Sequence, residues 1–231
     1  MRVHKEPSFV LHTRPHSETS LFVDLLSRDF GRLTVIAKGA RRQKSKFRGA
    51  LLPFRPLLAG WSGKGEIPVL TLAEASEPWT EIRGQGVLCG FYINELLMRL
   101  LHRHDAHPAL FDYYAEAVSR LRQADIFESA LRLFEKRLLR ELGYAMNLDV
   151  DVDSRREIDP GRRYRYIPHL GAVAEHHTRK GGVLISGAAL CALKNETFAN
   201  EQDLKECKKL MRAVISHQME HRPLYSRKLF R

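Results

Sequence analysis

The chain has 231 residues, of which 44% are hydrophobic and 28% are charged, so it can bury a core and is not a disordered polymer. Its formal net charge of +11 favours a polyanionic partner, either nucleic acid or an anionic membrane surface. No stretch approaches the ~20 apolar residues of a membrane span, and Cys89, Cys191 and Cys207 form no Cys-x-x-Cys pair, so we expect a protein of the reducing cytoplasm.

The first eighty residues have the pattern of a small β-barrel. Short β-prone runs, separated by Gly and Pro, occupy residues 9–12, 21–26, 31–37, 50–61 and 67–72. Five short strands with this punctuation are typical of a closed barrel of the OB type or of a sandwich. Pro53 and Pro56 interrupt the fourth run, so we expect an edge strand or a bulged strand there.

After residue 80 the hydrophobic period changes from that of strands to that of helices. Apolar residues at helical spacing indicate helices over about residues 91–101, 108–121, 127–142, 186–194 and 200–220. Pro108 suits a first helical turn, Gly143 suits a C-cap and Ser186 suits an N-cap.

The segment from about 146 to 182 is irregular and rich in charge, with a possible hairpin formed by residues 164–167 and 172–173. We therefore predict an α+β chain of two domains. Residues 1–80 form a five-stranded OB-type barrel, and residues 81–231 form a mainly α-helical domain that carries this irregular insertion.

A loop between the third and fourth predicted strands is rich in cations. It contains no acid and six basic residues, Lys38, Arg41, Arg42, Lys44, Lys46 and Arg48. A loop at this place in an OB barrel lies beside the groove that binds single strands, where cations hold phosphates and aromatic rings stack on bases. Phe47 and Trp61 are candidates either for stacking or for the core. Because the first eighty residues hold 13 cations against 7 acids, we predict a nucleic-acid-binding site in this loop.

Several short motifs follow one another along the chain in the order of one protein family. They are residues 14–21 (Arg-Pro-His-Ser-Glu-Thr-Ser-Leu), 31–33, 37–41, 49–54, 92–97, 131–132, 134–135, 142–144 and 226–230. Each motif alone is weak, but in this order the chain resembles the RecO family of bacterial recombination mediators over nearly its whole length.

The resemblance implies an N-terminal OB-fold, a helical C-terminal domain and a role in the repair of single-stranded gaps. It implies a protein that binds single- and double-stranded DNA, anneals complementary strands and contacts the C-terminal tail of the single-stranded DNA-binding protein. It also implies action with RecR to load the recombinase RecA. No nucleotide hydrolysis is implied, and the sequence has no phosphate-binding loop of the form Gly-x4-Gly-Lys-Ser/Thr. We therefore expect that the protein is not an enzyme.

Some members of that family carry a four-cysteine zinc site in the middle region. Residues 146–182 of this chain contain no cysteine, so we expect the fold to need neither zinc nor another cofactor. We expect the protein to work in the cytoplasm, associated with the nucleoid.

The third predicted helix carries a basic stripe, with Arg132, Lys136 and Arg140 at positions i, i+4 and i+8. A basic edge beside an apolar groove suits a peptide that ends in aromatic residues and a free carboxylate, as the tail of the single-stranded DNA-binding protein does. Only Arg132 matches the family position for this contact. We expect its stem to pack at the edge of the core and its guanidinium to stay in solvent. A solvated helix face is the alternative for Lys136 and Arg140.

Two other functions remain open. Asp149, Asp151 and Asp153 alternate in the sequence, as the carboxylates of a metal-dependent nuclease can. An RNA-binding OB protein is the other alternative, because phosphate contacts do not distinguish the two sugars. His217 and His221 stand four apart on a predicted helix, but no third metal ligand is evident near them.

Overall fold

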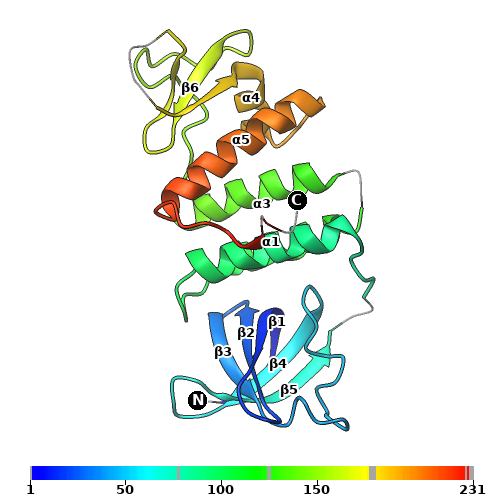
Figure 1. Cartoon of the computed structure of the whole chain (residues 1–231). Coiled ribbons are helices and arrows are strands. Elements are labelled where there is room, and N and C mark those ends of the chain that lie inside the picture. The colour runs from blue at the N-terminus through cyan, green and yellow to red at the C-terminus, as the bar shows by residue number, and fades with distance from the viewer. Residues whose placement is uncertain (1, 77–78, 124–125, 177–180, 227, 229–231) are drawn as a thin grey trace. The chain divides into compact units, whose positions relative to one another are not determined.

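The computed structural model describes residues 2–76, 79–123, 126–176, 181–226 and 228. The chain divides into two compact units (Figure 1). The first comprises Met1–Ala124 together with Tyr225–Arg231, and the second comprises Asp125–Leu224. The sequence pattern predicted a division near residue 80, whereas the first two helices group with the barrel.

The first unit contains a closed barrel of five strands in the order β1-β2-β3-β5-β4. The strands are β1 (Arg2–Pro15), β2 (Leu21–Ser27), β3 (Gly31–Ala37), β4 (Pro56–Ser62) and β5 (Val69–Ala75). Neighbours pair antiparallel except β3 and β5, whose parallel pairing of Ile36 with Val69 closes the barrel. The predicted OB-type barrel and the α+β class are confirmed.

Strand β4 shows how the prolines of the fourth run are accommodated. The strand begins at Pro56, where a missing N–H is tolerated best, and its register against β5 shifts between Gly60 and Trp61. β4 lies between β1 and β5 rather than at an edge. The prediction of a bulged strand is confirmed, and the edge alternative is wrong because closure of the barrel gives β4 two neighbours.

The barrel core includes both aromatic residues that we considered for base stacking. The Trp61 side chain is completely buried, and Phe47 extends from the basic loop into the same cluster as Leu33 and Leu57. Burial of a Phe side chain contributes about 1.5–3 kcal/mol, so Phe47 anchors the loop. Neither ring is available to stack on a base.

Two helices complete the first unit, α1 (Gln85–Leu100) and α2 (Pro108–Arg120), which begins at the predicted proline. The buried amide of Asn94 links them to the barrel, because its nitrogen donates to the carbonyl of Leu11 in β1 over 2.8 Å. The Tyr114 hydroxyl donates to the amide oxygen of Asn94 over 2.6 Å. This chain of bonds joins β1, α1 and α2.

The end of the chain is attached to α1 through the carboxylate of Glu95. That carboxylate accepts bonds from the backbone N–H groups of Tyr225 (2.9 Å) and Ser226 (2.8 Å), and from the Ser226 hydroxyl (2.7 Å). Arg99 donates to it as well, over 3.0 Å. The remaining residues of the closing motif apart from Lys228 lie outside the described residues, namely Arg227, Leu229 and Phe230.

The second unit combines three helices with a small antiparallel sheet in the order β7-β6-β8. The elements are α3 (Phe127–Glu141), β6 (Arg163–Ile167), β7 (Gly171–Ala174), β8 (Val183–Ser186), α4 (Gly187–Asn195) and α5 (Glu201–Gln218). The predicted hairpin is β6 with β7, whereas β8 was not predicted.

The helix ends of the second unit follow their sequence signals. Ser186 caps α4, because its hydroxyl accepts from the Ala189 N–H over 3.1 Å. Asn200 caps α5 by accepting from the Asp203 N–H over 2.8 Å. Gly143 follows α3 with φ of +82°, in the left-handed region that a glycine C-cap requires. The predicted roles of Ser186 and Gly143 at these helix ends are confirmed, and α5 ends two residues before the predicted position.

The loop before β6 is held by hydrogen bonds around the buried carboxylate of Asp151. One oxygen of that carboxylate accepts from the N–H groups of Asp153 (2.9 Å) and Ser154 (2.8 Å). These bonds outweigh the effect of burial and keep the pKa of Asp151 below its ordinary value. The Tyr164 hydroxyl accepts from the Asp159 N–H over 2.9 Å. Side-chain acceptors therefore order this part of the middle region.

Candidate nucleic-acid interface

The basic loop (residues 38–48) leaves β3 and proceeds through successive tight turns. The N–H of Arg42 donates to the carbonyl of Gly39 (3.1 Å), the N–H of Ser45 to Arg42 (3.0 Å) and the N–H of Arg48 to Ser45 (3.2 Å). Gly39 has φ of +70°, which a residue with a side chain rarely adopts. The turns give the loop a defined shape.

All six cations of the basic loop are exposed. Three of them donate to backbone carbonyls, Arg41 to Ser17 over 2.8 Å, Lys46 to Thr71 over 3.0 Å and Arg48 to Gln43 over 3.2 Å. A carbonyl fixes the position of a cation and leaves its charge uncompensated. In the described part of the chain, none of the six lies within ion-pair distance of a carboxylate, so the loop keeps its full positive charge.

A hollow of about 350 Å³ opens between the basic loop and the turn that joins β1 to β2. It is lined by His16, Ser17, Thr19, Ser20, Ile36, Lys38, Gly39 and Arg42. The N–H of Arg41 donates to the carbonyl of Thr19 over 3.0 Å, which joins the two segments. Hydroxyl groups and two cations around one hollow suit an anion such as a phosphate.

Arg132 on α3 is not in solvent, contrary to the sequence prediction. Its side chain is only 3% exposed, and its guanidinium donates to Glu135 over 2.6 Å and to Glu128 over 3.4 Å. The Glu135 side chain is completely buried. Helix α3 packs against α5, and this contact covers the position that helical spacing placed at the boundary of the core.

The other two members of the basic stripe have different environments. Lys136 is partly buried, and its ammonium group donates to the carbonyls of Leu193 (2.9 Å) and Lys194 (2.8 Å) at the end of α4. Arg140 is exposed. Its neighbour Tyr144, just beyond the helix, is 49% exposed, so an exposed cation and an exposed aromatic ring lie at the C-terminal end of α3.

The alternating aspartates do not converge on one point. Asp149 pairs with Lys194 over 2.7 Å, Asp151 accepts the backbone N–H groups of its own turn, and Asp153 is exposed. Among the residues that the structure describes, no group of three or more His, Cys, Asp or Glu is placed to hold a metal ion. This geometry gives no support to the metal-dependent nuclease alternative.

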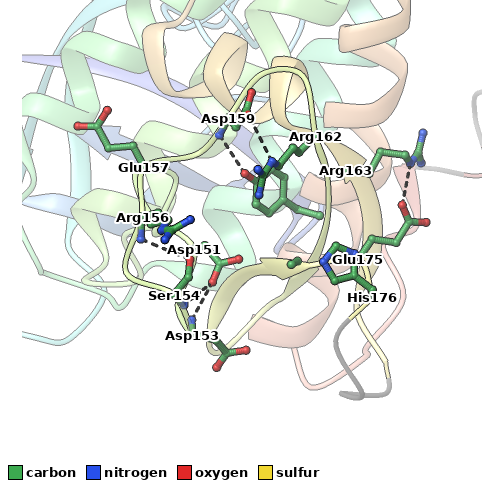
Figure 2. Close-up of a pocket in the computed structure, with 12 residues that line it drawn as sticks. Asp151, Asp153, Ser154, Arg156, Glu157, Asp159, Arg162, Arg163, Glu175 and His176 are labelled. Carbon is green, nitrogen blue, oxygen red and sulfur yellow. Dashed lines mark hydrogen bonds and ion pairs between the residues drawn. The ribbon is translucent and has the colours of Figure 1, made fainter.

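A pocket of about 720 Å³ lies beside these aspartates (Figure 2). Its lining carries charges of both signs, and pairs of them neutralise each other: Arg162 lies 3.2 Å from Asp159, and Arg163 lies 3.6 Å from Glu175. Figure 2 draws the side chains that line the pocket, with a dashed line joining the members of each of these two pairs. Because five acidic residues of the lining outnumber its three arginines, the pocket lacks the uncompensated positive charge of the basic loop.

Within the described ranges, no helix combines the length and the apolar character that crossing a membrane requires. His217 lies in α5, and the rings nearest to it are those of His169, at a tilted angle, and His221, edge-on. The ring of His217 lies 5.7 Å from that of His169 and 6.3 Å from that of His221, measured between centroids.

Comparison with known proteins covers the chain from end to end. A family model described as "Recombination protein O N terminal" matches residues 1–79, and one described as "Recombination protein O C terminal" matches residues 84–228. The chain is 44% identical to the DNA repair protein RecO of Aromatoleum aromaticum over 230 residues, which is 100% of this chain and 96% of that protein. It is 41% identical to the protein of that name from Thiobacillus denitrificans, over 100% of this chain and 92% of that protein. It is also 41% identical to the protein of that name from Coxiella burnetii, over 99% of this chain and 98% of that protein.

Proposed function

We propose, since the chain belongs to the RecO family of DNA repair proteins, that it binds single- and double-stranded DNA and anneals complementary strands. With RecR as a partner, it helps to load the recombinase RecA onto strands coated by the single-stranded DNA-binding protein. It acts as a binding protein that catalyses no reaction, in the cytoplasm and at the nucleoid.

The basic loop supports the DNA-binding part of the proposal most directly. Six exposed cations without a nearby carboxylate among the described residues, on a loop anchored by Phe47, form a surface of one sign. Like charges that repel one another lower the stability of the free protein, and phosphates relieve that repulsion. Phosphates occur in single strands and duplexes alike, so the basic loop suits both.

The salt dependence of DNA binding tests this assignment. Lys38, Arg42 and Lys44 have no side-chain partner within the described residues, so replacing all three by Gln removes charge without breaking a contact. Each phosphate contact contributes about 0.7–0.9 to the steepness of log affinity against log salt. We therefore expect the slope to become shallower by about 2 in this triple variant. Replacing three exposed cations of α5 by Gln is the matched control: Lys205, Lys209 and Arg212. Equal slopes for the two triple variants would contradict the proposal.

Two further measurements separate the alternatives. Binding and annealing should persist in a chelator, whereas a nuclease that used Asp149, Asp151 and Asp153 would lose its activity there. Unlabelled DNA and RNA strands of the same sequence should displace a labelled DNA strand from the protein unequally. The DNA strand should be the better competitor. Equal competition would favour the RNA-binding alternative.

For the tail of the single-stranded DNA-binding protein, the structure supports a contact at the C-terminal end of α3. Arg140 supplies an exposed guanidinium and Tyr144 an exposed ring, which match a peptide with a carboxylate and aromatic residues. Arg132 instead forms ion pairs with Glu128 and Glu135, so its guanidinium is not offered to the peptide.

Titration of a labelled tail peptide tests this contact. Arg140→Ala should weaken peptide binding by about 1–3 kcal/mol, the range of a hydrogen bond to a charged group, and Tyr144→Ala should weaken it too. Lys209→Ala on α5 is the control and should leave the affinity unchanged. Affinity for bare DNA should stay the same in all three variants, and a loss there would show that α3 is not a separate site.

A further inference from the structure

A stack of planar side chains lies on the barrel beside the basic loop. The ring of Phe22 in β2 lies 4.0 Å from that of His16, with 45° between the planes. The guanidinium carbon of Arg14 lies 5.0 Å from the centre of the Phe22 ring. Arg14 and Phe22 are cross-strand partners. Phe22, in the middle of the stack, is half-buried, whereas His16 and Arg14 on either side of it are exposed to solvent.

His16 belongs to this stack and also lines the hollow beside the basic loop. The hollow carries the cations of Lys38 and Arg42 and the hydroxyls of Ser17 and Thr19. An exposed ring next to a cationic, hydroxyl-lined hollow matches the two parts of a nucleotide, a flat base and a phosphate. Phe47 and Trp61 cannot supply the ring, since both are buried.

The turn that carries His16 is fixed before any ligand arrives. The N–H of His16 donates to the carbonyl of Ser20 over 3.1 Å and closes the turn. Arg41 then holds the turn to the basic loop by two bonds, from its N–H to Thr19 and from its guanidinium to Ser17. A preformed turn loses little conformational entropy on binding.

We infer that this part of the barrel holds one unpaired nucleotide, with its base stacked on the His16 ring and its phosphate in the hollow between Lys38 and Arg42. The inference rests on the proposed DNA binding and adds a preference for single strands. The bases of a duplex are already stacked on one another, so a duplex offers the site its phosphates alone.

Two substitutions at one position isolate the ring. His16→Gln removes it, and His16→Tyr keeps a ring in its place. Both new side chains are uncharged, so a difference between them reports stacking. Stacking of a base on an aromatic side chain corresponds to about a 5- to 150-fold change in affinity. We expect His16→Gln to weaken binding of a labelled single strand by that factor and His16→Tyr to keep it within about twofold. His4→Gln, at an exposed position of β1, is the matched control.

A duplex of the same length and a strand containing 2-aminopurine complete the test. We expect His16→Gln to bind the duplex as the unchanged protein does and to lose the fluorescence quenching of 2-aminopurine, which His16→Tyr should retain. Equal losses in the two His16 variants, an equal loss for the duplex, or full single-strand affinity in His16→Gln would each overturn the inference and leave the proposed function standing. If the unchanged protein bound neither strand nor duplex, both the proposed function and this inference would fail.

Discussion

Single residues show where sequence spacing is sufficient and where it is not. The caps Ser186 and Gly143 follow from local chemistry, because their partners lie within a few residues of the same helix end. Arg132 differs, since its exposure depends on α5, which is more than sixty residues away in the sequence. Helical spacing places Arg132 on the edge of the apolar face, and only the packing partner decides that this edge is covered.

The buried pair of Arg132 and Glu135 predicts a large loss of stability when one partner is removed. Arg132→Ala leaves a completely buried carboxylate without its main cation, which should cost about 3–5 kcal/mol in the free energy of unfolding. Urea unfolding measures the loss, and Arg140→Ala, at an exposed position of the same helix, is the control and should change stability by less than about 0.5 kcal/mol.

Replacing the pair together should restore most of that stability, because an apolar pair leaves no buried charge. Arg132→Met combined with Glu135→Leu is therefore expected to unfold at a higher urea concentration than Arg132→Ala alone. If Arg132→Ala unfolded at the same concentration as Arg140→Ala, the pair would not be buried as described.

Among the secondary-structure elements, the long periodic segments were predictable, as was the short hairpin of β6 and β7, whereas β8 was missed. In the part of the chain that the structure describes, the five barrel strands and the five helices each correspond to a predicted segment. The strand β8 has only four residues, Val183–Ser186, too few to show an alternating pattern, and it exists because β6 offers it an edge to pair with. The predicted first strand was also too short, since β1 continues through polar residues that pair with β4.

The attachment of the chain end to α1 predicts a response to acid. Burial raises the pKa of Glu95, but the hydrogen bonds from Ser226, Tyr225 and Arg99 outweigh it and bring the pKa below the ordinary value of 4.5. A lowered folded-state pKa stabilises the folded protein above the unfolded pKa, and this stability is lost as the pH falls through the folded pKa.

We therefore expect Glu95→Gln to lower the free energy of unfolding by about 1–3 kcal/mol at pH 7. The difference from the unchanged protein should shrink as the pH falls below 4.5, the ordinary value for this carboxyl. Thermal unfolding followed across pH measures both effects, with the exposed Glu201→Gln as control. A difference that stayed constant with pH would show that the Glu95 charge does not hold the segment.

For the whole molecule, the composition predicts a polyanionic partner, and the structure adds where positive charge is uncompensated among the described residues. The formal charge of +11 indicates a polyanion, but it does not tell the basic loop from the pocket of Figure 2, whose arginines face carboxylates. Whether a cation has a carboxylate beside it depends on which residues meet in space, and the spacing of residues along the chain does not predict this.

The whole chain is also expected to fold without zinc. Asp151 and Tyr164 organise the middle region through hydrogen bonds, so a chelator should leave the thermal midpoint unchanged, and Asp151→Ala should lower it. Elemental analysis of protein purified without added metal is the direct measurement. Stoichiometric zinc in that protein would contradict this expectation.

The attachment of Tyr225 and Ser226 to Glu95 has a consequence for synthesis on the ribosome. These two residues belong to the same compact unit as the barrel, although they are separated from it by the second unit in the sequence. Domains generally fold as they emerge, N-terminal first, but here the N-terminal unit lacks a part of itself until the whole second unit and residues 225 and 226 have been made. The barrel is made before the second unit, but the unit to which the barrel belongs is completed after it.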